Sequence, residues 1–311
     1  MTSDDVSQGE ACLLCFEDEQ ATATAAADAA GLALGVISRH RFPDGELRLK
    51  LPQALPAQVV LWRSLHHPNQ KLVELLLAAQ TARTLGARHL TLVAPYLAYM
   101  RQDMAFNPGE AVSQRIVGQF LASLFDSLIT VDPHLHRVVT LDEAVPVNDA
   151  VVLSGAPLLA DHVASRRTQP LLMGPDEESA QWVGLAAGRH GWEHAVCRKV
   201  RRGDHDVSIE LPDLPVAGRA VVLMDDVASS GHTVAQATRQ LLAAGAASVD
   251  LAVTHALFAA DAVALIREAG VGEIWSTDCI AHPTNAVSVV PAVAAVLRQL
   301  MAIGGDGLAP R

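Results

Sequence analysis

The sequence is poor in cysteine, in clustered positive charge and in long apolar runs, and each shortage excludes a class of protein. Four cysteines in 311 residues are too few for a disulfide-built fold, which indicates a reducing compartment such as the cytoplasm. The formal net charge of −11 argues against a nucleic-acid partner, because a phosphate backbone requires a basic face. Lysine and arginine cluster only at residues 198–202.

Long apolar runs are missing although half of the residues are apolar. No uncharged apolar stretch approaches the roughly 18 residues that span a bilayer, so we expect no membrane partner. Residues 1–10 are polar and acidic, without the basic and apolar regions of a signal peptide. The apolar residues are mainly alanine, leucine and valine in short runs, which predicts a large buried core.

Cys12 and Cys15 have the C-x-x-C spacing found in many metal and redox sites. The surrounding residues 11–16 are apolar and predict a buried strand, in which the two side chains would point to opposite faces. We therefore expect neither a redox nor a metal role for this pair.

Short β-rich runs alternate along the chain with longer helical runs, which is typical of βαβ units around a mainly parallel sheet. The sequence thus predicts an α/β fold. The expected strands include 59–62, 90–94, 128–131, 221–224 and 251–254.

One pattern that occurs twice in the sequence favours a chain of two similar halves. A helix that ends in Leu85-Gly86-Ala87 leads into a strand, and so does a helix that ends in Ala244-Gly245-Ala246, with glycine capping each helix. The two are separated by about half of the chain. We therefore expect one domain over residues 1–146 and a second over residues 147–311.

The most informative segment is 220–233, in which an apolar strand runs into Asp225-Asp226, a small-residue loop and a helix. Paired carboxylates suit the hydroxyls of a ribose or a Mg²⁺ ion, and the helix N-terminus favours a phosphate. The alternative is an ordinary surface turn with two solvated acids, which explains the Asp pair alone better than the whole string. The segment resembles the PRPP-binding motif of phosphoribosyltransferases and ribose-phosphate diphosphokinases.

Upstream segments distinguish these two families. Phe42-Pro43-Asp44-Gly45-Glu46, Arg101-Gln102-Asp103, Phe106-Asn107-Pro108-Gly109-Glu110-Ala111 and Asp132-Pro133-His134 resemble the ribose-phosphate diphosphokinases, or PRPP synthetases, in order and spacing. The form of the third segment, together with Ser229, is most similar to the archaeal-type branch. The resemblance implies two phosphoribosyltransferase-like domains, each with a mainly parallel sheet flanked by helices.

The resemblance also implies an activity and its substrates: Mg²⁺-dependent transfer of the diphosphoryl group of ATP to ribose 5-phosphate, giving PRPP and AMP. Phe42, Asp44 and Glu46 would hold the adenine of ATP from a neighbouring subunit, which implies a homo-oligomer with shared ATP sites. Arg101, Gln102 and Asp103 would line the ATP site, where a guanidinium suits phosphate oxygens.

The resemblance to PRPP synthetases also implies roles for the remaining site residues. Lys199 and Arg201 would be catalytic cations on a mobile loop, although a solvated hairpin with a turn at 202–204 also fits these residues. His134 would lie near Mg²⁺ and the transferred phosphates, and a zinc site formed with His136 is the less favoured alternative. Asp176 would bind metal or ribose phosphate, or is a solvated loop acid. The ribose 5-phosphate would be held by Asp225, Asp226, Ser229, Ser230, Gly231, His232 and Thr233.

Three departures from the family pattern leave alternatives open. Glu177-Glu178 replaces two glycines, His232 replaces a glycine, and residues 137–140 lack the usual aromatic residues. A non-catalytic regulatory homologue of PRPP synthetase is therefore one alternative function. A phosphoribosyltransferase that consumes PRPP is a second, separate alternative.

Overall fold

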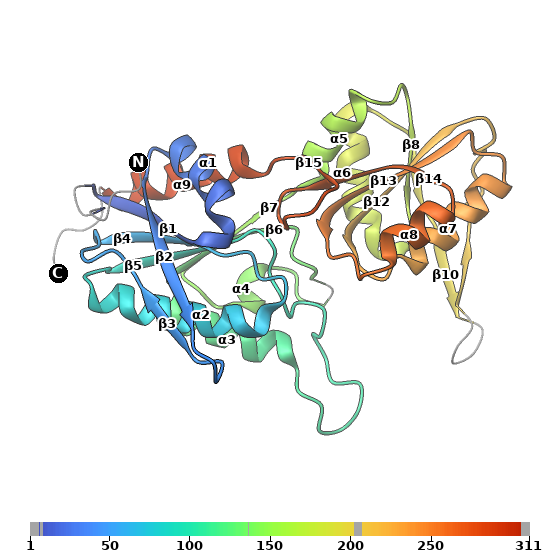
Figure 1. Ribbon diagram of the computed structural model, residues 1–311. Coiled ribbons are helices and arrows are strands. Elements are labelled where there is room, and N and C mark those ends of the chain that lie inside the picture. Colours follow the sequence, from blue (N-terminus) through green and yellow to red (C-terminus); the bar gives the residue numbers. More distant parts are fainter. Residues whose placement is uncertain (1–5, 7–8, 136, 202–206, 306–311) are drawn as a thin grey trace. The chain divides into compact units, whose positions relative to one another are not determined.

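The chain divides into two compact units in the computed structural model, and each unit is built around its own sheet (Figure 1). Unit 1 comprises residues 1–153 and 290–311, and unit 2 comprises residues 154–289. The structure describes residues 6, 9–135, 137–201 and 207–305, except for the side chains of 199–201, 207–208 and 302–305.

Unit 1 contains a seven-stranded sheet in the order β3-β2-β1-β4-β5-β6-β7. All neighbouring strands are parallel except β2 and β3, which form an antiparallel hairpin at one edge. The strands are β1 (Ala11–Phe16), β2 (Ala33–Arg41), β3 (Leu47–Lys50), β4 (Gln58–Trp62), β5 (His89–Ala94), β6 (Ser127–Val131) and β7 (Asp149–Leu153). The helices are η1 (Glu17–Glu19), α1 (Gln20–Ala30), α2 (Pro68–Thr84), α3 (Ser113–Leu124), α4 (Leu141–Ala144) and α9 (Val290–Gly305).

Unit 2 contains a six-stranded parallel sheet in the order β15-β14-β13-β12-β8-β9, with a separate antiparallel hairpin of β10 and β11. The strands are β8 (Leu171–Gly174), β9 (His194–Val196), β10 (Arg198–Arg201), β11 (Val207–Glu210), β12 (Ala220–Ala228), β13 (Ser248–Ala256), β14 (Val271–Thr277) and β15 (Asn285–Val287). The helices are α5 (Ala156–Ala164), η2 (Glu177–Ser179), α6 (Ala180–His190), α7 (His232–Ala243) and α8 (Ala262–Glu268).

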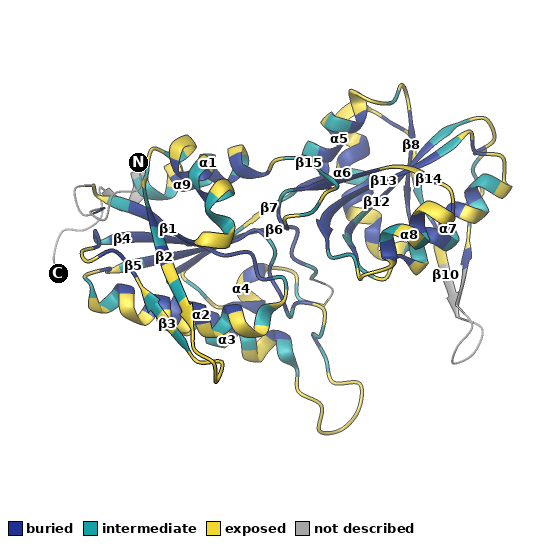
Figure 2. Ribbon diagram, viewed as in Figure 1, coloured by how far each residue is buried: buried dark blue, intermediate teal, exposed yellow. Residues whose placement is uncertain are grey.

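The central strands are buried on both faces, as parallel strands covered by helices require. Every residue of β4 and of β6 is buried, and the central strands are largely dark blue in Figure 2. This burial explains why these strands are continuous apolar runs in the sequence. The predicted α/β fold with two parallel sheets is confirmed.

The two units share one arrangement, in which a helix ends at a glycine that leads into a strand. The repeated glycine pattern in the sequence indicated this arrangement. Gly86 follows α2 and leads to β5, whereas Gly245 follows α7 and leads to β13. Both glycines have positive φ, 114° and 91°, the left-handed backbone that ends a helix. In each sheet these strands hold the same place, since β5 lies beside β4 and β13 lies beside β12.

The division of the chain differs in two ways from the domains expected at 1–146 and 147–311. Strand β7 pairs with β6, so residues 149–153 belong to unit 1. Helix α9 also belongs to unit 1, because it packs against α1 and Arg298 donates a hydrogen bond to the carbonyl of Ala29. Within the described residues, no helix is both long enough and apolar enough to cross a membrane.

All four cysteines are free and buried. Cys12 and Cys15 lie in strand β1, and burial raises the pKa of each thiol to about 12. The pKa of Cys197 is also raised to about 12, by burial first and by the negative charge of Asp176 second. Because the thiolate is the reactive form, these groups are poor nucleophiles at neutral pH.

We expect native protein at pH 8 to show almost no reaction with a disulfide reagent such as DTNB within minutes. The same protein in guanidinium chloride should release about four equivalents of thionitrobenzoate, since unfolding exposes every thiol. Fast reaction of a full equivalent in the native protein would contradict the burial of these side chains.

Candidate functional site

The carboxyl ends of β8 and β12 lie side by side at the point where the strand order of unit 2 changes direction. From β8 the chain continues to β9 on one side, and from β12 it continues to β13 and β14 on the other. Ligands of open parallel sheets bind at this kind of topological switch point. Asp176 follows β8, while Asp225 and Asp226 lie in the last half of β12, so all three carboxylates reach this edge.

The two aspartates of β12 belong to the strand itself and not to a loop after it. The strand extends to Ala228, beyond the expected end at residue 224, because Asp225 pairs with Val253 and Val227 with His255. Asp226 is 2% exposed, and its N–H donates to Oδ1 of Asp225 at 2.9 Å. The ladder therefore fixes the backbone of both aspartates.

Negative charge accumulates at this edge. Burial raises the pKa of Asp225 well above its ordinary value, and the charges of Asp226 and Asp176 raise it further. A cation, or the hydroxyl donors of a sugar, would offset this repulsion. Within the described residues, no group of three or more His, Cys, Asp or Glu side chains is arranged to hold a metal ion. The donor chemistry fits a hard cation that takes its remaining ligands from substrate and water.

The loop after β12 ends at Gly231, the residue before α7. Gly231 has φ 76°, and a Cβ there would lie 3.0 Å from the Ile266 side chain and 3.1 Å from the carbonyl oxygen of Ala262. Only glycine fits this position without strain. His232 is the exposed first residue of the helix, so its side chain is accommodated without a left-handed backbone.

Helix α7 presents its N-terminus beside the aspartates. Its cap residue is Gly231, and no side-chain hydrogen bond caps this helix within the described part of the chain. Ser230 and His232 are exposed here, while Ser229 and Thr233 are half-buried. First-turn N–H groups and hydroxyls at a helix N-terminus make a site that suits a phosphate.

The β10–β11 hairpin carries two of the expected catalytic residues. Lys199 pairs with Ile209, and Arg201 pairs with Val207, so both expected cations belong to a β-ladder at backbone level. The side chains of Lys199 and Arg201 lie outside the described residues, as does the expected turn at 202–204.

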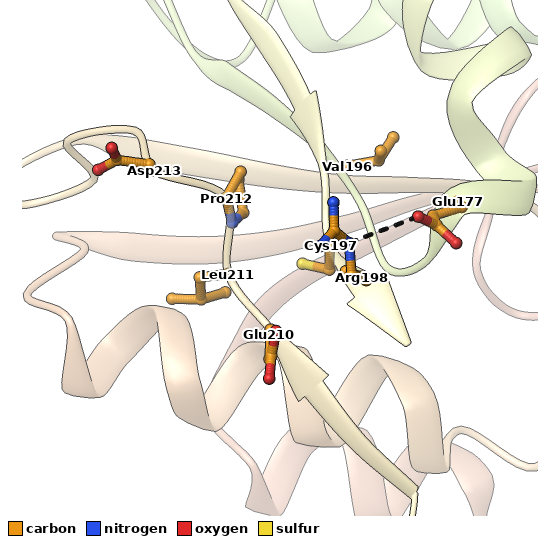
Figure 3. Close-up of a pocket in the computed structure, with 8 residues that line it drawn as sticks. All are labelled: Glu177, Val196, Cys197, Arg198, Glu210, Leu211, Pro212 and Asp213. Carbon is orange, nitrogen blue, oxygen red and sulfur yellow. Dashed lines mark ion pairs between the residues drawn. The ribbon is translucent and has the colours of Figure 1, made fainter. Parts of the chain in front are cut away.

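The base of this hairpin is joined to the loop that carries Asp176. The N–H of Cys197 donates to the carbonyl of Gly174 at 2.8 Å, and a cavity of about 370 Å³ lies beside Cys197. Figure 3 shows Arg198 and Glu177 facing one another in this cavity, with Nε and Oε1 3.7 Å apart. Glu177 is one of the two acids that replace glycines of the family pattern, and it thus has the guanidinium of Arg198 beside it.

Glu178, the second acid that replaces a glycine of the family pattern, makes a local contact through its backbone. The N–H of Glu178 donates to Oδ1 of Asp176 at 3.1 Å, which makes Asp176 the cap of the 3₁₀ turn η2. Glu177 and Glu178 are both exposed. Both side chains therefore reach solvent.

In unit 1, the residues expected to hold adenine share the tip of the β2–β3 hairpin. The N–H of Phe42 donates to the carbonyl of Glu46 at 2.9 Å, and the N–H of Glu46 donates to Oδ1 of Asp44 at 3.1 Å. Gly45 has φ 94°, which makes the tight turn possible. All three side chains are exposed, and the tip is yellow in Figure 2.

The structure places the three residues of the Arg101 loop differently from one another. Arg101 is exposed, whereas Oε1 of the half-buried Gln102 accepts a hydrogen bond from Ser113 at 3.0 Å. Asp103 is 8% exposed and pairs with Arg137 at 2.6 Å. Asp103 therefore fastens this loop to the segment that follows His134, which is half-buried beyond the end of β6.

Sequence reasoning missed two sets of charged residues: Arg137, and a buried cluster around Arg63 at the ends of β1 and β4. Arg63 was detectable as a charge directly after an apolar strand. Lys71 and Glu74 were detectable as charges inside a leucine-rich helix.

Comparisons with known proteins agree on one family. Residues 11–124 match the N-terminal domain of ribose phosphate pyrophosphokinase, and residues 147–264 match the phosphoribosyl transferase domain. Proteins named ribose-phosphate pyrophosphokinase from Methanopyrus kandleri and Halobacterium salinarum are 35% and 33% identical to this chain. These matches cover 86% and 92% of this chain, and 91% and 100% of the relatives.

A third relative, ribose-phosphate pyrophosphokinase 1 of Archaeoglobus fulgidus, is 36% identical over 86% of this chain and 93% of its own. The expected resemblance to archaeal proteins is confirmed by these relatives. The crystal structure of phosphoribosylpyrophosphate synthetase from Mycobacterium smegmatis has the same fold, with a TM-score of 0.84 and 21% identity. That match covers 95% of this chain and all of the solved chain.

Proposed function

The chain belongs to the ribose-phosphate pyrophosphokinase family, and on this premise we propose that it converts ATP and ribose 5-phosphate into PRPP and AMP. One observation carries the proposal beyond family membership. Asp176, Asp225, Asp226 and the N-terminus of α7 meet at the switch point of unit 2, where carboxylates for ribose hydroxyls lie beside donors for a phosphate.

The ribose 5-phosphate half of the site follows from this arrangement. Asp225 and Asp226 accept hydrogen bonds from the two ribose hydroxyls, which relieves the repulsion that raises the pKa of Asp225. Residues 229–233 hold the 5-phosphate through backbone N–H groups and hydroxyls. The anomeric hydroxyl is then fixed relative to the β12 edge, and such positioning lowers the barrier to its attack.

The chemical step is an in-line displacement at the β-phosphorus of ATP. The anomeric oxygen forms a bond to that phosphorus and loses its proton to water, while the bond from the phosphorus to the oxygen bridging the α- and β-phosphates breaks and AMP leaves. Lys199, Arg201 and Arg101 offset the negative charge that develops on the phosphoryl oxygens. His134 and Asp176 are each proposed as a residue that would hold Mg²⁺, which would supply positive charge to the transferred phosphates.

The nucleotide is proposed to bind through Phe42, Asp44 and Glu46 of one subunit and Arg101, Gln102 and Asp103 of another. The exposed position of the first three residues at a hairpin tip supports this arrangement, because the described part of their own unit does not cover them. The proposal therefore includes a homo-oligomer. It also includes the cytoplasm as the compartment, which the four free thiols support.

The test is to incubate the purified protein with ATP, Mg²⁺ and ribose 5-phosphate and to measure AMP and PRPP together. The proposal requires the two products in equal amounts, and neither when ribose 5-phosphate is omitted. AMP without PRPP would indicate a different reaction. Nucleotide binding without AMP would indicate a non-catalytic homologue, and binding of PRPP alone would indicate a phosphoribosyltransferase.

A further inference from the structure

Unit 1 has its own topological switch point, between β1 and β4, and a cluster of charged residues fills it. From β1 the chain continues to β2 on one side, and from β4 it continues to β5 on the other. The side chains at this edge form what we call the switch-point cluster: Asp18, Glu19, Arg39, Arg63 and Glu74.

Arg63 is the centre of the cluster and is 1% exposed. Its Nη1 lies 2.9 Å from both carboxylate oxygens of Asp18 and 2.9 Å from Oε2 of Glu19, while Nη2 donates to Oε2 of Glu74. The guanidinium also lies over the ring of Phe16, 4.5 Å from its centroid. A buried charge is tolerated only when it is paired in this way.

The cluster gives this edge a chemistry different from that of the equivalent edge in unit 2. There, carboxylates repel one another and raise the pKa of Asp225. Here, guanidinium groups lie among the carboxylates, and Arg63 lowers the pKa of Asp18 against the opposing effect of burial. The place that serves as the ligand site in unit 2 is thus occupied in unit 1 by the protein's own charged side chains.

One member of the cluster reaches it from the β2–β3 hairpin. Arg39 of β2 donates through Nη1 to Oε1 of Glu74, and its Nη2 lies 3.5 Å from Oδ1 of Asp18. Glu74 is 0% exposed and therefore bridges two arginines, Arg39 and Arg63, with its two oxygens. This bridge links the hairpin to α2 and to the end of β4.

The link lies where the hairpin leaves the sheet. Pairing of β2 with β1 ends at Ile37, opposite Phe16, while pairing of β2 with β3 continues from Ser38 to Arg41. Beyond Ile37 the hairpin is thus a two-stranded ribbon, and such a ribbon alone is only marginally stable. Arg39 lies two residues past the end of the β1 ladder and three residues before Phe42.

We propose that Arg39 and Glu74 are positioning residues, which hold the β2–β3 hairpin at the angle needed to present Phe42, Asp44 and Glu46 to the nucleotide. This inference rests on the proposed function, because it takes the hairpin tip as an adenine site. Neither residue touches the nucleotide. Their effect is on the fraction of molecules in which the tip is correctly placed before ATP binds.

The decisive variant is Arg39→Met. It removes the bond to Glu74 but keeps a long side chain over Phe16, and it leaves Glu74 paired with Arg63, so the fold survives. We expect the KM for ATP to rise about fivefold, while kcat and the KM for ribose 5-phosphate stay within about twofold. We also expect the backbone amides of residues 39–50 to exchange with deuterium faster, because the ribbon loses one of its links to α2 and keeps only the packing of β3 on that helix.

The matched control is Arg41→Met, which makes the same change two residues further along β2. Arg41 is exposed, and its side chain has no partner among the residues that the structure describes. We expect hydrogen exchange of the hairpin to stay unchanged in this control and to be partly restored in Arg39→Lys.

Equal effects of Arg39→Met and Arg41→Met would overturn the proposal, because loss of any nearby cation would then explain them. Unchanged hairpin exchange in Arg39→Met would overturn it as well. The exchange measurement needs no nucleotide. It therefore decides the positioning role even if the wild-type protein forms no PRPP, a result that would refute the proposed function separately.

Discussion

Asp225→Asn is expected to lower kcat/KM for ribose 5-phosphate by about 10- to 150-fold and, at the same time, to make the protein more stable. The loss of activity follows from replacing a charged acceptor of ribose hydroxyls with a neutral amide, since hydrogen bonds to charged groups contribute about 1.5–3 kcal/mol. The gain in stability follows from removing one of the carboxylates that repel one another at the end of β12.

The sign of the stability effect comes from the direction of the pKa shift. Burial, Asp226 and Asp176 raise the pKa of folded Asp225 above its ordinary value of 3.8. The carboxyl therefore favours the folded state only while it is protonated, and this contribution is lost as the pH rises through the raised pKa. Once ionised, the group opposes folding. The asparagine variant does not have this penalty, and we expect a gain on the order of 1 kcal/mol.

Thermal unfolding of both proteins between pH 4 and pH 8 tests this expectation. The difference in Tm should be small at the acidic end, grow as the pH rises, and reach a few degrees near neutrality. Asp213→Asn is the matched control, because it makes the same change on an exposed loop of unit 2. If Asp225→Asn is less stable than the wild-type protein at pH 7, the repulsion between Asp225 and Asp226 does not destabilise the folded state.

The sequence indicated only part of the repulsion among the carboxylates of Asp225, Asp226 and Asp176. Adjacent aspartates after an apolar run indicated a polar site at a strand end, and the structure places both aspartates in the last half of β12. The sequence could not show that β12 continues to Ala228, because that extension depends on pairing with β13, which is distant in the chain. Nor could it show that Asp176 lies close enough to affect the pKa of Asp225.

Local patterns predicted the fold well because parallel strands are continuous apolar runs and glycines mark the helix ends. The same patterns did not indicate β2, whose residues 33–41 mix apolar and basic side chains. The last helix looks like a continuation of the second half of the chain. Its assignment to unit 1 depends on contacts with α1, about 270 residues earlier in the chain, and no local signal encodes such contacts.

The sequence also did not predict the networks of ion pairs. Arg39 lies in β2, Glu74 lies in α2 and Arg63 directly follows β4, and any one of them alone is an ordinary charged residue in the sequence. Asp103 was expected to line the ATP site, and that role stays a prediction. The structure adds that one of its oxygens is held by Arg137.

Gly231→Ala is expected to damage ribose 5-phosphate binding through the backbone alone. The new methyl group would lie 3.0 Å from Ile266 and 3.1 Å from the carbonyl of Ala262, in a residue whose φ of 76° already disfavours a side chain. The loop before α7 must then shift, and a displacement of about 1 Å at a substrate-positioning element can cost about 100-fold in rate. We expect a fall of that order in kcat/KM for ribose 5-phosphate, with direct nucleotide binding unchanged.

Gly191→Ala separates this effect from the general cost of a side chain in the left-handed region. Gly191 caps α6 in the same unit with φ 67°, and a Cβ there would meet no described atom within 4 Å. Both variants should lose about 1–2 kcal/mol of stability in urea unfolding, because both force alanine into the same backbone region. Only Gly231→Ala should lose activity. If Gly191→Ala lowers kcat/KM equally, loss of stability and not the shape of the loop explains the result, and the phosphate role assigned to residues 229–233 fails this test.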